Sequence, residues 1–258
     1  MKLCRAKGFE SEILLLTKFT QEKYVKSIVN GQLFMNNIKY FVDLENQTKV
    51  KGQGDRYEAA NILSNVTFKM YLQGTDTLIG EGTAGQIIER NHVFDNIPIF
   101  CFTAFDSSDF KIIDETENSY KVVFDIASHE VDKMIADFGT KAILINPVSF
   151  INKVDEAFRK KGIEYQADKV KYEDLSVNRV EKIESYRVPT TTPLFTKDIY
   201  FKYQREFRIV LLNHRVEKSY IAEIGRLDEK RGLGDTAFHV MDTIEFFQNT
   251  LLDVVKRK

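Results

Sequence analysis

The order of strand-like and helix-like segments constrains the fold of this chain most. Segments rich in β-branched and aromatic residues indicate strands at 13–19, 97–105, 121–126, 141–148 and 199–212. Apolar residues at helical spacing predict a smaller number of helices, at 20–30, 128–138, 150–161 and 243–255. Because strands and helices alternate irregularly, the order favours a mixed, largely antiparallel sheet with flanking helices, which is an α+β fold.

Residues typical of helix ends mark these helices. Thr20 and Ser128 are expected N-caps, since their hydroxyl groups can accept a hydrogen bond from the first helical turn. Gly31, Gly139 and Gly162 each follow a helical segment, where glycine commonly ends a helix.

The remaining segments are predicted as extended chain or loops. We expect extended chain at 32–42, a loop at 45–54, a loop or twisted hairpin at 74–85, a solvent-facing strand pair at 165–186 and a loop at 188–196. We interpret residues 1–258 as a single domain with a flexible insertion around 45–95.

Composition excludes several classes of protein. With 37 basic and 38 acidic side chains, the chain has no global field to capture nucleic acid or a membrane, so such a contact needs a local patch. Cys4 and Cys101 lie far apart in no metal-site spacing, so we expect no metal. Without a secretory signal or an uncharged run of roughly 18 residues, we expect a cytoplasmic protein with no membrane contact. No dinucleotide-binding glycine motif or P-loop follows a strand.

The segment 199–212 carries the most informative polar pattern. If it is one strand, Lys202, Gln204, Glu206 and Arg208 share one face, while the opposite face is apolar apart from Arg205. A carboxylate flanked by two cations and an amide suits a reaction that develops positive charge, with Arg208 holding Glu206 ionised. The alternative is an exposed sheet face with a ladder of charges.

A second polar group follows a glycine. Asp55 and Glu58 lie three residues apart with Arg56 between them, so the two acids could share a cation or position a ligand hydroxyl. The alternative is the N-terminus of a helix, where acidic residues are favoured by the helix dipole.

Gln204-Arg205-Glu206 resembles the Gln/Glu-x-Glu motif that ADP-ribosyltransferase toxins carry on a core strand. The resemblance implies an ADP-ribosyltransferase-like fold and NAD as a substrate. It also implies that Glu206 anchors the nicotinamide ribose and stabilises the oxocarbenium-like state, while Gln204 orients the acceptor.

The order of four motifs resembles a group of poorly characterised bacterial and phage proteins. The motifs are Asn30–Phe34, Asp55–Glu58, Cys101–Thr103 and Gln204-x-Glu206-x-Arg208. This sequence departs from the group in having Gly-Asp where many members have Asn-Asp-Pro, and in the long insertion after Glu58.

On a transferase layout, Lys18 would take the cation position near the dinucleotide and Thr103 that of a strand-borne Ser/Thr. The alternatives are a solvated edge lysine and a packing threonine. The expected cleft is lined by Lys18, Tyr40, Asp55, Arg56, Glu58, Thr103, Gln204, Glu206 and Arg208.

The resemblance therefore implies an enzyme that transfers ADP-ribose from NAD to a protein or nucleic-acid acceptor in phage–host conflict. The rival hypothesis is a non-catalytic phage or defence protein that uses the same cleft to hold a nucleotide ligand or a protein partner.

Overall fold

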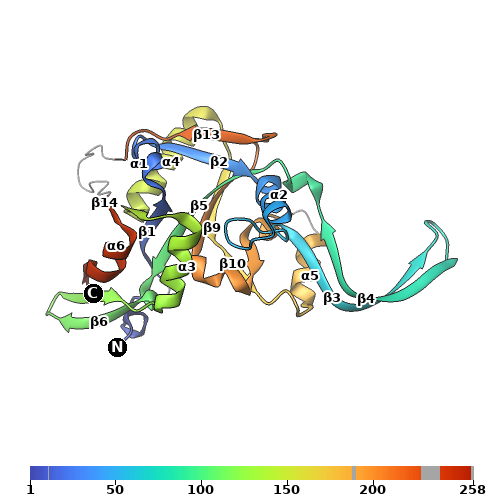
Figure 1. Cartoon of the computed structure of the whole chain (residues 1–258), viewed down its shortest axis with the longest axis horizontal. Helices are drawn as coiled ribbons and strands as arrows, with labels where there is room; N and C mark the ends of the chain where they lie inside the picture. The colour runs from blue at the N-terminus through green and yellow to red at the C-terminus, as the bar shows by residue number, and fades with distance from the viewer. Residues whose placement is uncertain (11, 188–189, 228–238, 257–258) are drawn as a thin grey trace.

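The computed structural model describes residues 1–10, 12–187, 190–227 and 239–256 (Figure 1). At its centre is an eight-stranded sheet in which every pairing is antiparallel. Its strands are β1 (Ile13–Thr20), β2 (Gln32–Asn37), β5 (Pro98–Asp106), β8 (Lys141–Ile145), β9 (Tyr165–Lys169), β12 (Glu206–Leu211), β13 (Ser219–Glu223) and β14 (His239–Asp242).

The sheet forks at β5. Strand β12 pairs along one edge of β5, with Glu206 opposite Thr103, and then pairs with β9. The other edge is shared: β2 pairs near the start of β5, where Asn36 is opposite Ile99, and β1 pairs near its end, where Thr17 is opposite Thr103. From this fork β1 continues to β8 and β14, while β2 continues to β13.

One face of the sheet is covered by α1 (Glu22–Val29) and α4 (Pro147–Lys161). Phe102 of this face contacts Phe150 of α4, with ring centroids 4.8 Å apart. Burial of this aromatic and aliphatic surface is the main favourable term that holds α4 on the sheet.

The opposite face carries two separate apolar clusters. Near the end of β5, Phe105 packs with Met134 of α3 (Ser128–Phe138) and Phe246 of α6 (Thr243–Asn249). Near its start, Ile99 packs with Ile38 of α2 (Ile38–Thr48). Between the two clusters, the buried residues of this face are polar.

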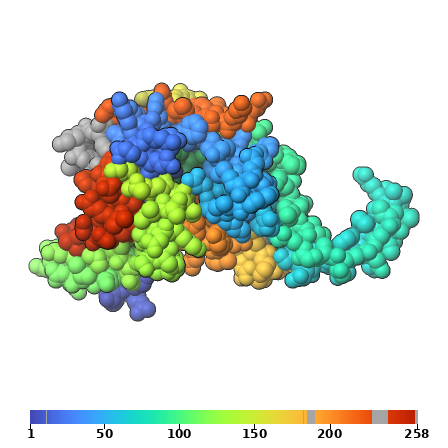
Figure 2. Space-filling view, in the orientation of Figure 1, coloured from blue at the N-terminus to red at the C-terminus, as the bar shows by residue number. Residues whose placement is uncertain are grey.

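A long hairpin projects from the body of the protein (Figures 1 and 2). It consists of β3 (Ala60–Tyr71) and β4 (Leu78–Arg90), paired from Ala60–Arg90 to Tyr71–Leu78. The prediction of a hairpin at 74–85 is confirmed, and much of the segment expected as an insertion is this arm.

The other elements are short. They are the strands β6 (Phe110–Glu115), β7 (Ser119–Phe124) and β15 (Leu251–Val255) in a three-stranded sheet, the parallel pair β10 (Lys171–Glu173) and β11 (Thr196–Asp198), helix α5 (Val180–Arg187), and the 3₁₀ helices η1 (Leu3–Arg5), η2 (His92–Phe94), η3 (Ser107–Asp109), η4 (Thr192–Phe195) and η5 (Ile199–Gln204). Mixed α and β content with mostly antiparallel pairing confirms the α+β class. No helix within the described ranges is long and apolar enough to cross a membrane.

The expected helix ends are confirmed on the glycine side only. Gly31, Gly139 and Gly162 follow their helices with positive φ, and a Cβ at Gly31 would lie 1.9 Å from the carbonyl oxygen of Gly225. The N-cap predictions are wrong: Thr20 ends β1, and Ser128 is already the first residue of α3.

Several predicted segments change type within their length, including the predicted strand 141–148, in which β8 ends at Ile145 and α4 begins at Pro147. The extended segment 32–42 gives way to α2 at Ile38, because the Asn37 side chain accepts a hydrogen bond from the backbone N–H of Tyr40 at 2.9 Å. As a result, α2 also occupies the first part of the predicted loop at 45–54. The predicted helix 243–255 ends at Asn249 and continues as β15, and the predicted strand 199–212 begins with η5.

The predicted strand pair at 165–186 is also wrong. Strand β9 pairs with β12 and β10 pairs with β11, so the two neighbours in sequence join different sheets. The segment then ends in α5. In the predicted loop 188–196, residues 188–189 lie outside the described ranges and the rest includes η4.

Candidate functional site

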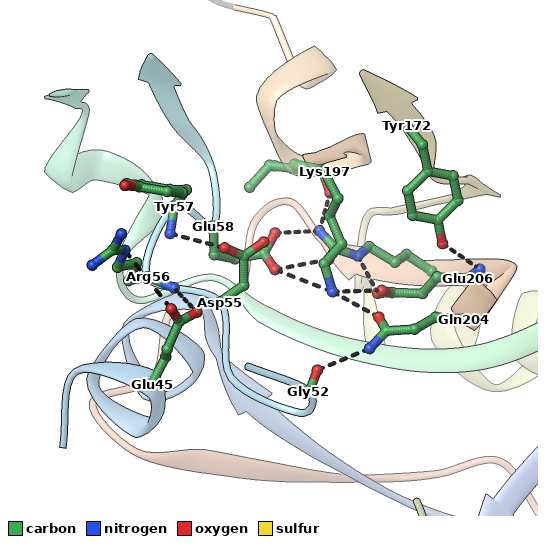
Figure 3. Close-up of polar contacts among 12 residues, drawn as sticks. Glu45, Gly52, Asp55, Arg56, Tyr57, Glu58, Tyr172, Lys197, Gln204 and Glu206 are labelled. Atoms are coloured by element: carbon green, nitrogen blue, oxygen red, sulfur yellow. Dashed lines mark hydrogen bonds and ion pairs between the residues drawn. The ribbon is translucent and has the colours of Figure 1, made fainter. Parts of the chain in front are cut away.

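A buried ion pair joins the segment around Asp55 to β12 (Figure 3). The guanidinium of Arg208 contacts both carboxylate oxygens of Glu58, with Nη1–Oε1 at 2.6 Å and Nη2–Oε2 at 2.9 Å. Its Nη1 also donates to the carbonyl oxygen of Leu194 at 2.6 Å. Arg208 is only 1% exposed, so this bidentate pair satisfies a charge that would be very costly to bury alone.

Glu206 connects Arg208 to a second cation, Lys197 of β11. One oxygen of Glu206 accepts from Arg208 Nε, and the other lies 3.0 Å from Lys197 Nζ. Lys197 Nζ also donates to Gln204 Oε1 at 3.0 Å and lies 3.9 Å from Glu58. We call Glu58, Lys197, Gln204, Glu206 and Arg208 the charge network.

Two further hydrogen bonds fix the charge network to its surroundings. Gln204 Nε2 donates to the carbonyl oxygen of Gly52 at 2.8 Å, which ties the loop 49–54 to the network (Figure 3). The backbone N–H of Glu206 donates to the Tyr172 hydroxyl at 2.8 Å.

Burial and nearby charges shift the pKa values here in opposite directions. Burial alone would raise the pKa of Glu206, but Arg208 and Lys197 hold it well below its usual value, so the carboxylate is ionised. Burial raises the pKa of Asp55 to about 7, helped by the neighbouring Glu58 and opposed by Lys197. The site thus combines the ionised carboxylate of Glu206, the bidentate carboxylate of Glu58, two cations and Asp55, which titrates near neutral pH.

A left-handed residue explains why simple strand alternation fails before Glu206. Arg205 has φ +47° between η5 and β12, and its side chain binds Asp109 at 2.7 Å and Glu130 at 2.9 Å. Gln204 therefore lies on a 3₁₀ turn, and the exposed Lys202 does not join it on one strand face. The predicted face of Lys202, Gln204, Glu206 and Arg208 is wrong as a strand, although its last three members do meet.

Thr103 and Thr17 extend the polar strip across three adjacent strands. Thr103 is the register partner of Glu206 on one side and of Thr17 on the other. Directly opposed residues point to the same face, so all three share the face that carries the network. Thr17 Oγ1 is buried and makes no hydrogen bond with any residue that the structure describes.

Lys18 fills the fork of the sheet instead. Its Nζ donates to the backbone carbonyl of Cys101 at 2.7 Å and lies 4.5 Å from the ring centroid of Phe100. Burial lowers the pKa of Lys18, and the negative charge of Glu206 opposes this shift. Lys18 therefore satisfies a β5 carbonyl where β1 and β2 separate, and makes no hydrogen bond to Glu206.

Five of the expected site residues come together: Asp55, Glu58, Gln204, Glu206 and Arg208. Tyr40 and Arg56 do not join them. The Tyr40 ring is exposed and packs against Phe41, and Arg56 Nε points to Glu45 at 3.7 Å. The expected cleft is filled by the side chains themselves, since Glu206 is only 6% exposed.

Two surface hollows lie away from the charge network. One, of about 350 Å³, is formed by residues of α3 and α6, including Ile135 and Ile244. The other, of about 330 Å³, lies between β1 and α4 and is mainly apolar, with Ile13 and Ile151 in its wall. Neither is lined by a member of the network.

Sequence reasoning missed Lys197 and Tyr172. Neither belongs to a motif, and both reach the site through the parallel β10–β11 pair. No charge count pointed to Lys197, because the expected cleft already contained three cations, Lys18, Arg56 and Arg208, beside its three acids.

Comparisons of the chain with protein-family models, with curated proteins and with solved structures give no match. The functional argument therefore rests on the geometry of the charge network and its neighbours.

Proposed function

We propose that this protein is an ADP-ribosyltransferase-like enzyme that transfers ADP-ribose from NAD to a protein or nucleic-acid acceptor. The observation that carries the proposal is the position of Glu206. Its ionised carboxylate is on the first residue of β12, beside the Gln204 amide and in register with Thr103 on the adjacent strand. The activity would take place in the cytoplasm and serve phage–host conflict, as the motif resemblance implies.

The proposed transfer of ADP-ribose requires a fixed negative charge beside the reacting ribose. When the bond between ribose C1′ and the nicotinamide nitrogen breaks, nicotinamide leaves with the electron pair and positive charge develops on the ribose. Glu206 would stabilise that charge and accept a hydrogen bond from a ribose hydroxyl. An acceptor oxygen or nitrogen then bonds to C1′. Its proton passes to water, because the Gln204 amide can orient the acceptor but cannot take a proton.

The loop 49–54 covers the entrance in this proposal. It contacts the network through the Gly52 carbonyl, and Gln53 bonds a backbone carbonyl of α3 at Asp137. Because Glu206 is buried beneath these contacts, NAD would enter as the loop moves aside.

The test is nicotinamide release from NAD by the purified protein, with and without cell lysate, followed by chromatography. We expect Glu206→Gln to lower the release at least about 100-fold, as removal of a charge-stabilising group does. Glu81→Gln, an exposed carboxylate on the hairpin arm, is the matched control and should leave the release unchanged. Intact NAD under every condition would contradict the proposal.

A second candidate is a non-catalytic protein that holds a nucleotide ligand or a protein partner. The observation that favours it is the saturation of Glu206, which already binds both Arg208 and Lys197. This candidate predicts that NAD binds and is recovered unchanged, and that Glu206→Gln alters affinity alone.

A further inference from the structure

A cluster of cations and aromatic rings lies beside the charge network, on the surface. Lys51 Nζ is 5.0 Å from the ring centroid of Tyr200, and Lys133 Nζ is 4.9 Å from the same centroid. Lys133 is also 5.0 Å from the Tyr203 ring, and Lys51 is 5.9 Å from that of Phe201. We call Lys51, Lys133 and Tyr200 the lysine–tyrosine patch.

The cations of the patch contact aromatic rings rather than carboxylates. Neither Lys51 nor Lys133 forms an ion pair with a carboxylate among the residues that the structure describes. The nearby Asp137 accepts a hydrogen bond from the Tyr203 hydroxyl, and the charge of Lys133 opposes the increase that burial causes in the pKa of Asp137. Lys133 is exposed and Tyr200 is 42% exposed. Both ammonium groups lie near the same ring, and a ligand anion that contacts them would offset their mutual repulsion.

The patch adjoins the charge network through covalent neighbours. Lys51 precedes Gly52, whose carbonyl binds Gln204, and Tyr200 belongs to the same 3₁₀ helix as Gln204. A ligand that reached from Glu206 to the surface past the loop 49–54 would therefore cross the patch.

We propose that the lysine–tyrosine patch binds the two phosphates of a nucleoside diphosphate, with the base or ribose against the Tyr200 ring. Lysine ammonium groups suit phosphate as compact point charges, and an exposed aromatic ring accepts a flat base of any identity. The choice of ligand rests on the proposed function, since the ADP half of NAD is such a group. A nucleic-acid strand is less favoured, because the patch is small and the whole chain has a net charge of −1.

The test is calorimetric titration of the full chain with ADP. We expect wild type to bind ADP more tightly than adenosine, and Lys51→Gln/Lys133→Gln to weaken ADP binding at least tenfold. Tyr200→Leu should weaken it severalfold. The matched control Lys69→Gln/Lys218→Gln removes two exposed lysines elsewhere and should bind as wild type does. Circular dichroism and thermal melting establish that each variant is folded.

Three results would overturn the proposal: no ADP binding by wild type, equal binding by the patch variant and its control, or tighter binding of a single-stranded oligonucleotide than of ADP. Failure of the proposed function can be distinguished from failure of the patch proposal. If wild type binds ADP with the expected lysine dependence but releases no nicotinamide from NAD, the patch stands and the transferase does not.

Discussion

The charge network and the lysine–tyrosine patch use the same kind of side chain in opposite ways. In the network, the cations of Arg208 and Lys197 are buried and bound by Glu58 and Glu206. In the patch, Lys51 and Lys133 lie against aromatic rings and form no ion pair with a carboxylate in the described part of the chain. We therefore expect that removing a charge from the charge network lowers the free energy of unfolding. Removing a charge from the patch should instead weaken ligand binding.

The largest effect is expected for Glu58→Gln. This change removes the bidentate partner of Arg208 and leaves a buried guanidinium with only one carboxylate. We expect a loss of about 3–5 kcal/mol in the free energy of unfolding, measured by urea denaturation. Glu81→Gln on the arm should change it by less than about 0.5 kcal/mol. If Glu58→Gln and Glu81→Gln both lost only a little free energy of unfolding, the charge network would not stabilise the fold in the way that distinguishes it from the patch.

The next effect is on the pH dependence of stability, through Asp55. Its pKa is raised from the usual 3.8 to about 7 in the folded protein, so the folded state keeps a proton that the unfolded chain has released. Stability from this group is full below about pH 4 and is lost as pH rises to about 7. The slope is about 1.4 kcal/mol per pH unit.

Asp55→Asn removes this titration, so the variant should gain on wild type steadily from pH 5 to pH 7. Glu206 does not contribute in this window, because its lowered pKa keeps it ionised throughout. Urea denaturation of both proteins at several pH values measures the difference. Parallel stability profiles would show that Asp55 is not protonated in the folded protein.

A smaller change in the free energy of unfolding is expected when the buried hydroxyl of Thr17 is removed. Thr17→Val keeps the shape of the side chain and removes a buried polar group that has no partner among the described residues. We expect stability to rise by about 1 kcal/mol. A loss of similar size would mean that the hydroxyl is hydrogen-bonded in solution, as a ligand or water site beside Thr103 would require.

The smallest effect on stability is expected in the patch. Lys51→Gln and Lys133→Gln remove exposed or partly buried cations without ion-pair partners, so each should change the free energy of unfolding by less than about 0.5 kcal/mol. Thermal melting of the two variants checks this. A loss above about 2 kcal/mol would show that the patch serves the fold.

Much of the sheet was predictable because its strands are apolar and local. The strands at 13–19 and 97–105 agree with β1 and β5 almost to the residue, since apolar residues dominate each segment. Asp55, Glu58, Glu206 and Arg208 meet in the structure, as the expected cleft placed them. That expectation came from the motif resemblance, because Asp55 and Glu58 lie in a polar stretch of the sequence with no apolar pattern around it.

The failures arose where tertiary contacts override local pattern. Residues 199–204 carry the aromatic residues of a strand, but Arg205 adopts a left-handed conformation that its bonds to Asp109 and Glu130 stabilise. In the same way, Leu251–Val255 completes a helical spacing but pairs with β7. Lys197 could not be found from any motif, because it reaches the network through a strand pair distant in sequence.

The most direct test of the central claim is the steady-state rate of nicotinamide release over a range of NAD concentrations. If Glu206 stabilises the reacting ribose and the patch holds the phosphates, Glu206→Gln should lower kcat with little change in KM. The variant Lys51→Gln/Lys133→Gln should raise KM at least tenfold with little change in kcat. No release by wild type, or the same kinetic change in both variants, would contradict the account.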